Sequence, residues 1–456
     1  MAGLDPILAN RFEPGLLDIP SYRSISSINR ELRIADGAGT TTMMVPSDDG
    51  AHILAIYGKF VELFGKPTVE TLLPHRSTDH AIDPEPSYKL PYWRIYNLSE
   101  FEFRMLKDYI KATLANRFIQ RSSSPVAAPI LFAMRQDGGL RLCFDYHTYN
   151  LVIVKNRYPR AQISAMHDQV REARIFTKLH LFGAYNLIRI KEGDKYKTAV
   201  RMPYSQFKSW VMPFGLTNVL ATFQSYIDDC LRPYIDDFAV WYLDDKLIYP
   251  THEKEHEEHV RHVLLRLKGF GVYCKAEKCQ FGVSEVSFLG YIITPDGVGM
   301  ESDWISRIKD WLTRKSVGDV QVLLGFMNSY RRFIRKYGKV TLSLTQLLKK
   351  TEASPRGNKV AHSAKWEWMW QLKLAFRKQK MTITKASILH HLDLVKPISL
   401  QTDVSGVAIG GILNQYDSFG DLRPVNYYSR NCSSAKENYD TYDRELLAIV
   451  EKRKQW

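Results

Sequence analysis

Over residues 71–249 the apolar residues fall in short runs separated by turn-forming residues. Two of these runs, APILFAM and LRLCFDY, flank Asp-Gly-Gly, which is typical of a hairpin between two strands. Over residues 253–268 the period changes to that of one helix face, and Gly269 follows as a stop signal. The apolar positions of this face are Val260, Val263, Leu264 and Leu267. The pattern therefore predicts short strands followed by an amphipathic helix.

The remaining segments are expected to add further helices and strands. Residues 1–50 are rich in Gly, Pro, Ser and Asp without a sustained period, which indicates a loosely ordered lead-in. We expect a short helix over 53–64, amphipathic helices over 302–350, a linker over 351–365, two strands over 398–415 and a helix over 443–456.

Two adjacent aspartates, Asp244 and Asp245, lie between two apolar runs in AVWYLDDKLIY. The flanking aromatic, β-branched and aliphatic residues favour two strands joined by a tight turn, with both carboxylates at its tip. Aspartate is common in turns, so one interpretation is a surface hairpin without further chemistry. The other is a metal site, because two neighbouring like charges repel unless a cation such as Mg²⁺, which prefers oxygen ligands, joins them.

Composition makes a polyanionic partner the leading expectation. The 456 residues carry 63 Lys and Arg against 49 Asp and Glu, which gives a formal net charge of +14 and a pI near 9.3. Such a surplus favours nucleic acid, since each cation placed against a phosphate releases a counterion. An apolar content of 45% and a charged content of 25% are those of an ordinary globular protein, and the length permits two or three domains.

The sequence also predicts the compartment. No segment has the roughly 18 consecutive apolar residues of a membrane-spanning helix, and the first residues lack a signal-peptide core. The five cysteines are scattered and odd in number, which favours a reducing environment. We therefore expect an intracellular protein, cytoplasmic or nuclear, that is neither secreted nor bound to a membrane.

Two clusters of polar residues on the predicted helices are open to a functional or a structural interpretation. Histidines at 252, 256, 259 and 262 could ligate a metal, but they lie opposite the apolar face among glutamates, which favours a solvated face. In the 302–350 segment, aromatic residues alternate with arginines, a composition suited to stacking on bases beside phosphate contacts. The aromatic residues concerned are Phe326, Tyr330, Phe333 and Tyr337.

A series of motifs strongly resembles the reverse transcriptase–ribonuclease H region of Ty3/Gypsy-type retrotransposon polyproteins. The resemblance runs from about Leu73 to the last residue. In order, the motifs are LPHRSTDHAID, APILFAMRQDGGLRLCFDYHTYN, KNRYP, FTKLHLFGAYNLIRI, VMPFGLTNVLATFQ, YLDD, FLGYIIT, LLGFMNSYRRFI, QTDVSG and NYDTYDRELLAIV. So many motifs in the family's order make chance agreement negligible.

The resemblance implies an α+β fold: a right-hand polymerase with fingers, palm and thumb, followed by a partial ribonuclease H-like α/β domain. It divides the chain into a lead-in (1–70), fingers and palm (71–295), thumb and connection helices with a linker (296–365), and a connection with a truncated ribonuclease H-like domain (366–456). Because only two of that domain's four metal-binding carboxylates, Asp403 and Glu445, precede Trp456, cleavage of RNA is not expected.

For the palm, the resemblance implies primer extension with deoxynucleoside triphosphates (dNTPs) by Asp244 and Asp245. These would hold Mg²⁺ or Mn²⁺, two ions in an intact site, which stabilise the attacking and leaving oxygens. Tyr185 would exclude a 2′-hydroxyl. The residues expected around the nucleotide are Arg135, Arg141, Tyr185, Phe214, Gly215 and Gln224, and those expected on the template–primer duplex are Arg331, Arg332, Arg335 and Lys336. The resemblance leaves dimerisation open.

The chain departs from the family's pattern at the palm. His180 stands where the third metal-binding aspartate is expected, and an imidazole offers one softer ligand atom and no negative charge. Lys246 replaces an apolar residue directly after the aspartate pair and could place an ammonium near the site. Three hypotheses follow: a polymerase that tolerates His180, a polyprotein remnant with impaired catalysis, or a nucleic-acid-binding module without chemistry.

Overall fold

A computed structural model shows two compact units, each described here by itself. One unit comprises the described residues up to Met166 together with Ala173–Val283, and the other comprises His167–Glu172 and the described residues from Ser284 onward. The structure describes residues 56–64, 72–134, 139–159, 163–250, 252–310, 317–352, 374, 377, 380–384, 388–404, 408–432 and 439–453. The predicted lead-in over 1–50 and nearly all of the predicted linker over 351–365 lie outside these residues.

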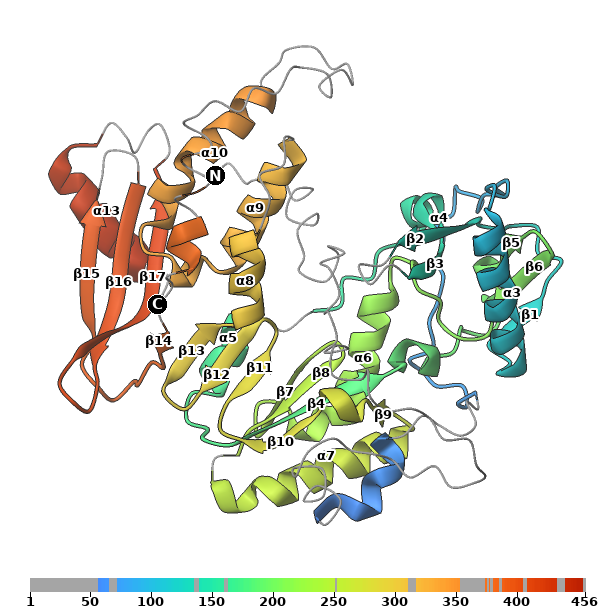
Figure 1. The fold of residues 1–456 in the computed structure, drawn as a ribbon, viewed down its shortest axis with the longest axis horizontal. Coiled ribbons are helices and arrows are strands. Elements are labelled where there is room, and N and C mark those ends of the chain that lie inside the picture. The colour runs from blue at the N-terminus through green and yellow to red at the C-terminus, as the bar shows by residue number, and fades with distance from the viewer. Residues whose placement is uncertain are drawn as a thin grey trace. The chain divides into compact units, whose positions relative to one another are not determined.

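The central sheet of the first unit has the strand order β10-β4-β8-β7, and β9 pairs with the end of β4 (Figure 1). The strands are β4 (Phe176–Phe182), β7 (Ala239–Tyr242), β8 (Asp245–Ile248), β9 (Tyr273–Cys274) and β10 (Gln280–Val283). All neighbours are antiparallel. The apolar runs around the aspartate pair therefore form a two-stranded hairpin, as the sequence pattern predicts, and most of their side chains are buried.

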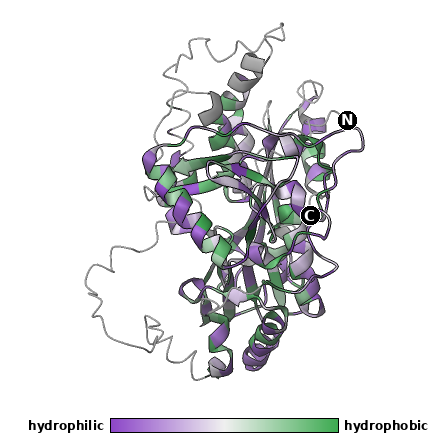
Figure 2. Ribbon diagram, turned by 90° about the vertical axis from the view of Figure 1, so that its right-hand side faces the viewer, coloured by the Kyte–Doolittle hydropathy of each residue, from purple (hydrophilic) through white to green (hydrophobic). Residues whose placement is uncertain are grey.

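Helices α6 (Val219–Leu231) and α7 (His256–Phe270) pack on each other, and α7 contacts β8. The four apolar residues of the predicted α7 face are fully buried, and each contributes about 1.5–3 kcal/mol of hydrophobic stabilisation. Figure 2 shows that the helical ribbons carry both hydrophilic and hydrophobic residues, as amphipathic helices do. Gly269 does not stop α7, because the helix continues to Phe270 and Gly271 adopts the left-handed cap conformation (φ 70°).

The solvated-face interpretation of the α7 histidines holds for His252 and His262, which are exposed, but is wrong for His256. His256 is buried, and its Nε2 hydrogen-bonds to Thr177 Oγ1 on β4 at 2.7 Å. His259 stacks on Phe238 with the ring centroids 3.9 Å apart. Among the residues that the structure describes, no group of three or more His, Cys, Asp or Glu side chains is placed to hold a metal ion.

Two smaller sheets and a capped helix complete the first unit. The Asp-Gly-Gly hairpin is confirmed by the antiparallel pairing of β2 with β3, and β1, β6 and β5 form a separate three-stranded sheet. Helix α3 begins with a capping box in which Ser99 and Glu102 each bond to the other's backbone N–H. The predicted helix over 53–64 is described from residue 56 and is mostly 3₁₀ in type. Bounds are α3 (Glu100–Ala115), α4 (His147–Val152), β1 (Ile119–Arg121), β2 (Ile130–Met134), β3 (Leu140–Phe144), β5 (Val200–Met202), β6 (Ser205–Ser209) and η1 (Gly58–Phe64).

The second unit contains two antiparallel sheets, β11-β12-β13-β14 and β15-β16-β17 (Figure 1). Helix α10 contacts β16 and β17, and α13 contacts β15 and β16. The strand pair predicted over 398–415 corresponds to β15 and β16, and the helices predicted over 302–350 are α8, α9 and α10. Bounds are β11 (Val286–Phe288), β12 (Tyr291–Thr294), β13 (Gly297–Met300), β14 (Leu389–His390), β15 (Ser399–Val404), β16 (Ala408–Tyr416), β17 (Leu422–Asn431), α8 (Ser302–Asp310), α9 (Val317–Ser329), η7 (Arg331–Phe333), α10 (Tyr337–Glu352) and α13 (Thr441–Arg453). The end of α5 (Ile163–Gln169), from His167 onward, also belongs to this unit.

The aromatic residues of the 326–337 segment do not form the stacking surface that their sequence suggests. Tyr330 and Phe333 are buried and pack on Tyr291 with ring centroids 5.1 and 5.8 Å away. Phe326 packs against Trp304. The alternation therefore supplies part of the second unit's core. Within the described part of the chain, no helix is long and apolar enough to cross a membrane.

A buried histidine makes the stability of the second unit sensitive to acid. His167 is 4% exposed, packs edge-on against Tyr291 at 4.6 Å, and has no hydrogen-bond partner among the described residues for either ring nitrogen. Burial, with the charge of Arg332, lowers the pKa of His167 to about 3. Because this value lies below the 6.5 of an unfolded chain, the stabilisation is complete above pH 6.5 and is lost as the pH falls toward the folded-state value.

We predict that the free energy of unfolding of the second unit falls by about 2 kcal/mol between pH 7 and pH 5 through His167 alone. Urea unfolding of the His167→Phe variant, which keeps an aromatic ring against Tyr291, should show a smaller loss over this range. His262→Phe, at an exposed histidine, is the control and should behave as the unaltered chain. Equal pH dependence of His167→Phe and the unaltered chain would contradict the prediction.

Candidate active site

The aspartate pair sits in a two-residue turn between β7 and β8. Tyr242 pairs with Asp245, which leaves Leu243 and Asp244 as the turn residues. Leu243 has a φ of 49°, a left-handed conformation that is uncommon for a bulky side chain. A strained residue persists only where its surroundings hold it, and such residues cluster at functional sites. The turn thus presents both carboxylates next to a backbone under strain.

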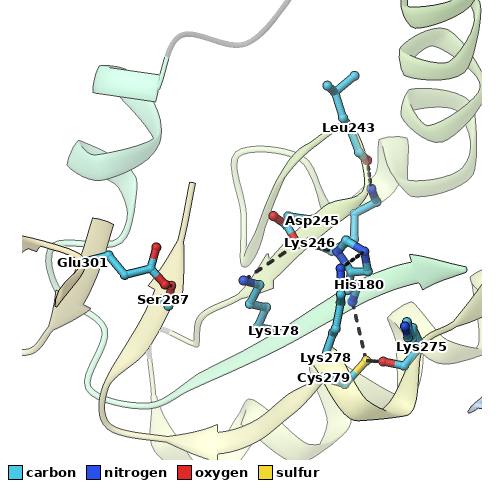
Figure 3. A network of polar contacts seen from close by, with 10 residues as sticks. All are labelled: Lys178, His180, Leu243, Asp245, Lys246, Lys275, Lys278, Cys279, Ser287 and Glu301. Carbon is cyan, nitrogen blue, oxygen red and sulfur yellow. Dashed lines mark hydrogen bonds and ion pairs between the residues drawn. The ribbon is translucent and has the colours of Figure 1, made fainter. Parts of the chain in front are cut away.

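His180 lies directly opposite the turn, because β4 pairs with β8 in the register that sets His180 against Asp245. His180 Nδ1 is 2.9 Å from Asp245 Oδ1 (Figure 3). The Asp245 carboxylate can only accept, so Nδ1 carries the proton of this hydrogen bond, and the Lys278 ammonium lies 3.4 Å from Nε2. The imidazole is therefore oriented by two partners and bonded to one of the two aspartates.

The two carboxyl groups differ in their electrostatic surroundings. Burial raises the pKa of Asp244, and the charges of Lys246 and His180 offset only part of this rise. Burial acts on Asp245 too, but the hydrogen bond from His180 and the charge of Lys178 outweigh it, so the pKa of Asp245 is lowered. Lys178 Nζ lies 3.8 Å from Asp245 Oδ1. Asp245 is thus held as an anion by protein cations.

Lys246 is a buried ammonium next to the turn. Its side chain is 1% exposed, on the face of β8 opposite to Asp245, and its Nζ donates a hydrogen bond to the carbonyl of Leu243 (Figure 3). Nζ also lies 5.9 Å from the centre of the Phe223 ring. Burial lowers the pKa of Lys246 to about 8, although the charge of Asp244 opposes this shift. The ammonium therefore contacts both the strained turn, through Leu243, and helix α6, through Phe223.

These side chains offer limited ligation to a metal ion. Carboxylate oxygens suit Mg²⁺ and Mn²⁺, so Asp244 and Asp245 could serve as ligands, whereas the imidazole of His180 is a softer donor already bonded to Asp245. Three lysines around the pair already supply positive charge, which a divalent cation would meet as repulsion. The donor set therefore fits one hard divalent cation better than two.

An aromatic group beside the turn brings together several residues expected at the nucleotide site. Tyr185 stacks on Phe223 at 4.7 Å and packs against Phe214 at 4.9 Å, and Asp244 is close enough to affect the pKa of Tyr185, which burial raises. The guanidinium of Arg141 lies 5.3 Å from the centre of the Phe214 ring, which is half exposed. These side chains form a surface with the cation of Arg141, the half-exposed ring of Phe214 and the partly buried Tyr185.

The backbone at Gly215 requires glycine. Its φ is 99°, and a Cβ at this position would come within 3.1 Å of the Phe144 carbonyl oxygen. A side chain here would therefore strain the backbone and press on the Phe144 carbonyl. Arg135, the remaining cation expected on the triphosphate, lies outside the described residues.

Gln224 is buried and braces the turn. Its Oε1 accepts from the N–H of Leu243 at 3.4 Å, and its Nε2 donates to Asp228 Oδ1 at 2.8 Å. Asp228 also accepts from the Trp241 indole and the Tyr158 hydroxyl, both at 2.7 Å. The sequence places Gln224 near the template side of a nucleotide pocket, whereas the structure assigns its polar atoms to this network.

The sequence analysis named Lys246 but missed this network and the two other lysines, Lys178 and Lys278. Lys178 could have been found, because residues two apart on a strand share a face and His180 follows it at that spacing. No sequence signal marks Asp228 or Lys278, since their proximity to the turn comes from α6 and the segment after β9.

The four basic residues expected on a nucleic-acid duplex occupy different environments. Arg331, Arg335 and Lys336 are exposed. Arg332 is instead mostly buried, stacks on Phe333 at 5.8 Å, and has a pKa lowered by burial. Its expected role on an exposed binding surface is therefore not supported, because the guanidinium packs into the second unit's core.

Asp403 and Glu445 lie on neighbouring elements of the second unit. Asp403 is on β15, paired with Gly410 of β16, and Glu445 is an exposed residue of α13, which contacts β15. The topology thus places α13, which carries Glu445, against β15, which carries Asp403.

The chain matches two families. Residues 92–293 match the family described as reverse transcriptase (RNA-dependent DNA polymerase), and residues 368–456 match the RNase H-like domain found in reverse transcriptase. The chain is 33% identical over 403 residues to the Transposon Tf2-3 and Tf2-4 polyproteins of Schizosaccharomyces pombe (strain 972 / ATCC 24843). This match covers 88% of the chain but only 29% of the length of these polyproteins.

Solved structures with a similar fold include two of the foamy viral protease-reverse transcriptase. One, in complex with dsDNA, has a TM-score of 0.74 at 18% sequence identity, covering 90% of this chain and 82% of that chain. Another, in complex with an RNA/DNA hybrid, has a TM-score of 0.71 at 17% identity, covering 90% of this chain and 54% of that chain. At this level of identity the likeness concerns the fold. The chain therefore has the α+β fold of these structures, with residues 92–293 similar to the reverse transcriptase family and residues 368–456 similar to the RNase H-like domain found in reverse transcriptase.

Proposed function

We propose that the chain is the reverse transcriptase–ribonuclease H region of a Ty3/Gypsy-type retrotransposon polyprotein, with its polymerase chemistry impaired by His180. The likeness to the transposon polyproteins and the reverse transcriptase match support the ancestry. The observation that carries the impairment is the hydrogen bond from His180 to Asp245 within a cluster of lysines. In this proposal the protein acts inside the cell, in the cytoplasm or nucleus.

In the proposed polymerase, separate groups of residues would bind the nucleotide, hold the metal ions and support the aspartate turn. Arg141 and Phe214 would bind the incoming dNTP, the guanidinium through the fork geometry that suits phosphate oxygens, and Tyr185 would border the sugar. Divalent cations, when bound by Asp244 and Asp245, supply neutralisation of the charge that develops during phosphoryl transfer. Gln224 and Lys246 hold the turn that presents these carboxylates.

His180 weakens this arrangement in two ways. It removes one negative charge that an aspartate would add to the site, and it bonds to Asp245 Oδ1, which is then less available as a ligand. Phosphoryl transfer depends almost entirely on positioning and charge stabilisation, so a site short of one carboxylate loses several kcal/mol. For the second unit, we propose that Asp403 and Glu445 belong to a ribonuclease H-like metal site.

A second candidate function is binding of a template–primer duplex without chemistry. It is favoured by the lysines Lys178, Lys246 and Lys278 near the aspartate pair, which balance its charge without a metal ion. The foamy viral structures of similar fold were solved with an RNA/DNA hybrid and with dsDNA, which makes such duplexes the natural partners to test.

We predict that His180→Asp increases primer extension on an RNA template with Mg²⁺ by roughly a hundredfold or more, because restoring a carboxylate recovers about 3 kcal/mol of transition-state stabilisation. Single-turnover extension rates with a preformed primer–template complex provide the measurement. Asp245→Asn in the His180→Asp background should abolish the gain, since it removes a proposed ligand.

The matched control is His252→Asp, which adds the same charge at an exposed histidine and should leave the rate unchanged. Extension by the unaltered chain at a rate close to that of His180→Asp would refute the impairment. Duplex binding by both chains without extension by either would favour the binding function.

We also predict that Lys246→Ile stabilises the first unit at pH 7, by up to about 3 kcal/mol, because a buried ammonium with a pKa of about 8 is disfavoured in the folded state. The cost of Lys246 is complete below pH 8 and disappears as the pH rises toward 10.5, so the gap between the two chains should close over that range. Denaturant unfolding at pH 7, 8 and 10 measures it.

Lys191→Ile, at an exposed lysine, is the control and should show no such pH-dependent gap. A Lys246→Ile chain that is less stable at pH 7 would mean that the hydrogen bond to Leu243 outweighs the cost of burial.

A further inference from the structure

The edge of β4 opposite to β8 is met by a short segment that carries two cysteines. β10 pairs with β4 as far as Lys178, and β9 pairs with it from Leu181 onward, so the backbone of His180 lies between these pairings. The His180 N–H donates to Cys279 Sγ at 3.5 Å, and its carbonyl accepts from the N–H of Lys275 at 2.8 Å (Figure 3). The sulfur of Cys279 thus satisfies a backbone donor of the strand.

The same segment brings two sulfur atoms together. Cys274 is the last residue of β9, pairs with Leu181, and is followed directly by Lys275. The Cys279 thiol donates to the Lys275 carbonyl at 3.3 Å, so its sulfur touches the residue next to Cys274. The thiols of Cys274 and Cys279 are also hydrogen-bond partners of each other. The two side chains are therefore in contact, which is the first requirement for a disulfide.

The two thiols differ in exposure and in electrostatic surroundings. Cys274 is 1% exposed, whereas Cys279 is half-buried. The hydrogen bond from Cys274 lowers the pKa of Cys279, and the His180 N–H and the charge of Lys178 act in the same direction, against the effect of burial. The same hydrogen bond, together with burial, raises the pKa of Cys274. Cys279 is thus the more accessible thiol and the one more readily ionised, which are the properties of a reactive cysteine.

We propose that Cys274 and Cys279 form a site of reversible oxidation, which takes hydrogen peroxide as its oxidant and yields a disulfide at the edge of β4. The contact between the two side chains carries this inference. It goes beyond the proposed function and does not depend on it, because the chemistry requires only the two thiols and the peroxide. An accessible thiolate beside a second cysteine is the arrangement in which a sulfenic acid is converted into a disulfide.

The reaction balances with peroxide as the only oxidant. The Cys279 thiolate attacks one peroxide oxygen, the O–O bond breaks, and the departing hydroxide takes up the proton lost by Cys279 and leaves as water. The Cys274 sulfur then attacks the sulfur of the Cys279 sulfenic acid, the S–O bond breaks, and the oxygen leaves as a second water with the proton of Cys274. Two thiols are oxidised to one disulfide, and one peroxide is reduced to two waters. Thiol–disulfide exchange with a reducing thiol reverses the change.

The test is disulfide mapping of the full chain after oxidation. The reduced protein is treated with a small excess of hydrogen peroxide at pH 7, the remaining thiols are alkylated, and the tryptic peptides are analysed by mass spectrometry without reduction. Trypsin cleaves after Lys275 and Lys278, so a disulfide between Cys274 and Cys279 joins two peptides that are otherwise separate. We expect this linked pair to appear with peroxide and to disappear with dithiothreitol.

Oxidation rates of the single cysteines, measured by isotope-coded alkylation, provide a second readout. Cys279 should react on the order of tenfold faster than Cys143, which is also half-buried but lies on β3. In concentrated urea this difference should vanish, because unfolding removes the contacts that favour the thiolate. Lys178→Gln should slow the oxidation of Cys279 several-fold, whereas Lys191→Gln, at an exposed lysine, should leave the rate unchanged.

Two variants separate the steps of the reaction. Cys274→Ala removes the second thiol, so the oxidation of Cys279 should stop at the sulfenic acid, which dimedone captures. Cys279→Ser should leave Cys274 reduced, because Cys274 is buried. Cys432→Ser, at a half-buried cysteine of the second unit, is the control and should form the linked pair at the rate of the unaltered chain.

The result from the unaltered chain does not depend on whether the variants fold. A linked peptide pair, with a rate preference for Cys279 that is lost in urea, would support the inference. Separate peptides of Cys274 and Cys279 after peroxide has oxidised Cys143 would overturn it, and so would oxidation of Cys279 beyond the sulfenic acid without a disulfide. Primer extension and duplex binding are measured on the reduced chain, so their outcome is distinguishable from this one.

Discussion

The pairing of β4 with β8 is the constraint on which the site depends. This antiparallel register sets His180 against Asp245, and β4 also carries β10 and β9 on its other edge. A shift of one residue would turn every side chain of β4 to the opposite face, which would expose its buried Leu179 and Leu181. The buried sheet therefore dictates that the imidazole meets the aspartate turn.

That geometry explains how the chain itself offsets the repulsion between the two carboxylates. Two neighbouring carboxylates in a largely buried site would repel, but His180 and the surrounding lysines supply hydrogen bonds and positive charge. On the opposite face of β8, Lys246 donates a hydrogen bond to the carbonyl of the strained Leu243. The hydrogen bond from His180 leaves Asp245 Oδ1 less available to a divalent cation, which is the physical basis of the proposed loss of catalysis.

Much of the architecture could be predicted from local patterns. The two hairpins, the apolar face of α7 and the strand pair β15–β16 follow from period and turn residues, because these signals act over a few neighbouring positions. The sequence-based predictions were wrong where tertiary contacts override these local signals. His256 is buried and hydrogen-bonds to Thr177. Helix α7 continues past Gly269 to a cap at Gly271. The aromatic residues around Arg332 pack into the core of the second unit.

The sequence by itself determined the family resemblance, the identity of the aspartate pair and the substitution at His180, because these depend only on residue types in order. Only the tertiary structure decided which groups surround them. Lys278 comes from the segment after β9, and Gln224 and Asp228 come from α6. Such neighbours are brought together by sheet register and helix packing, which act over distances in the chain that no local pattern spans.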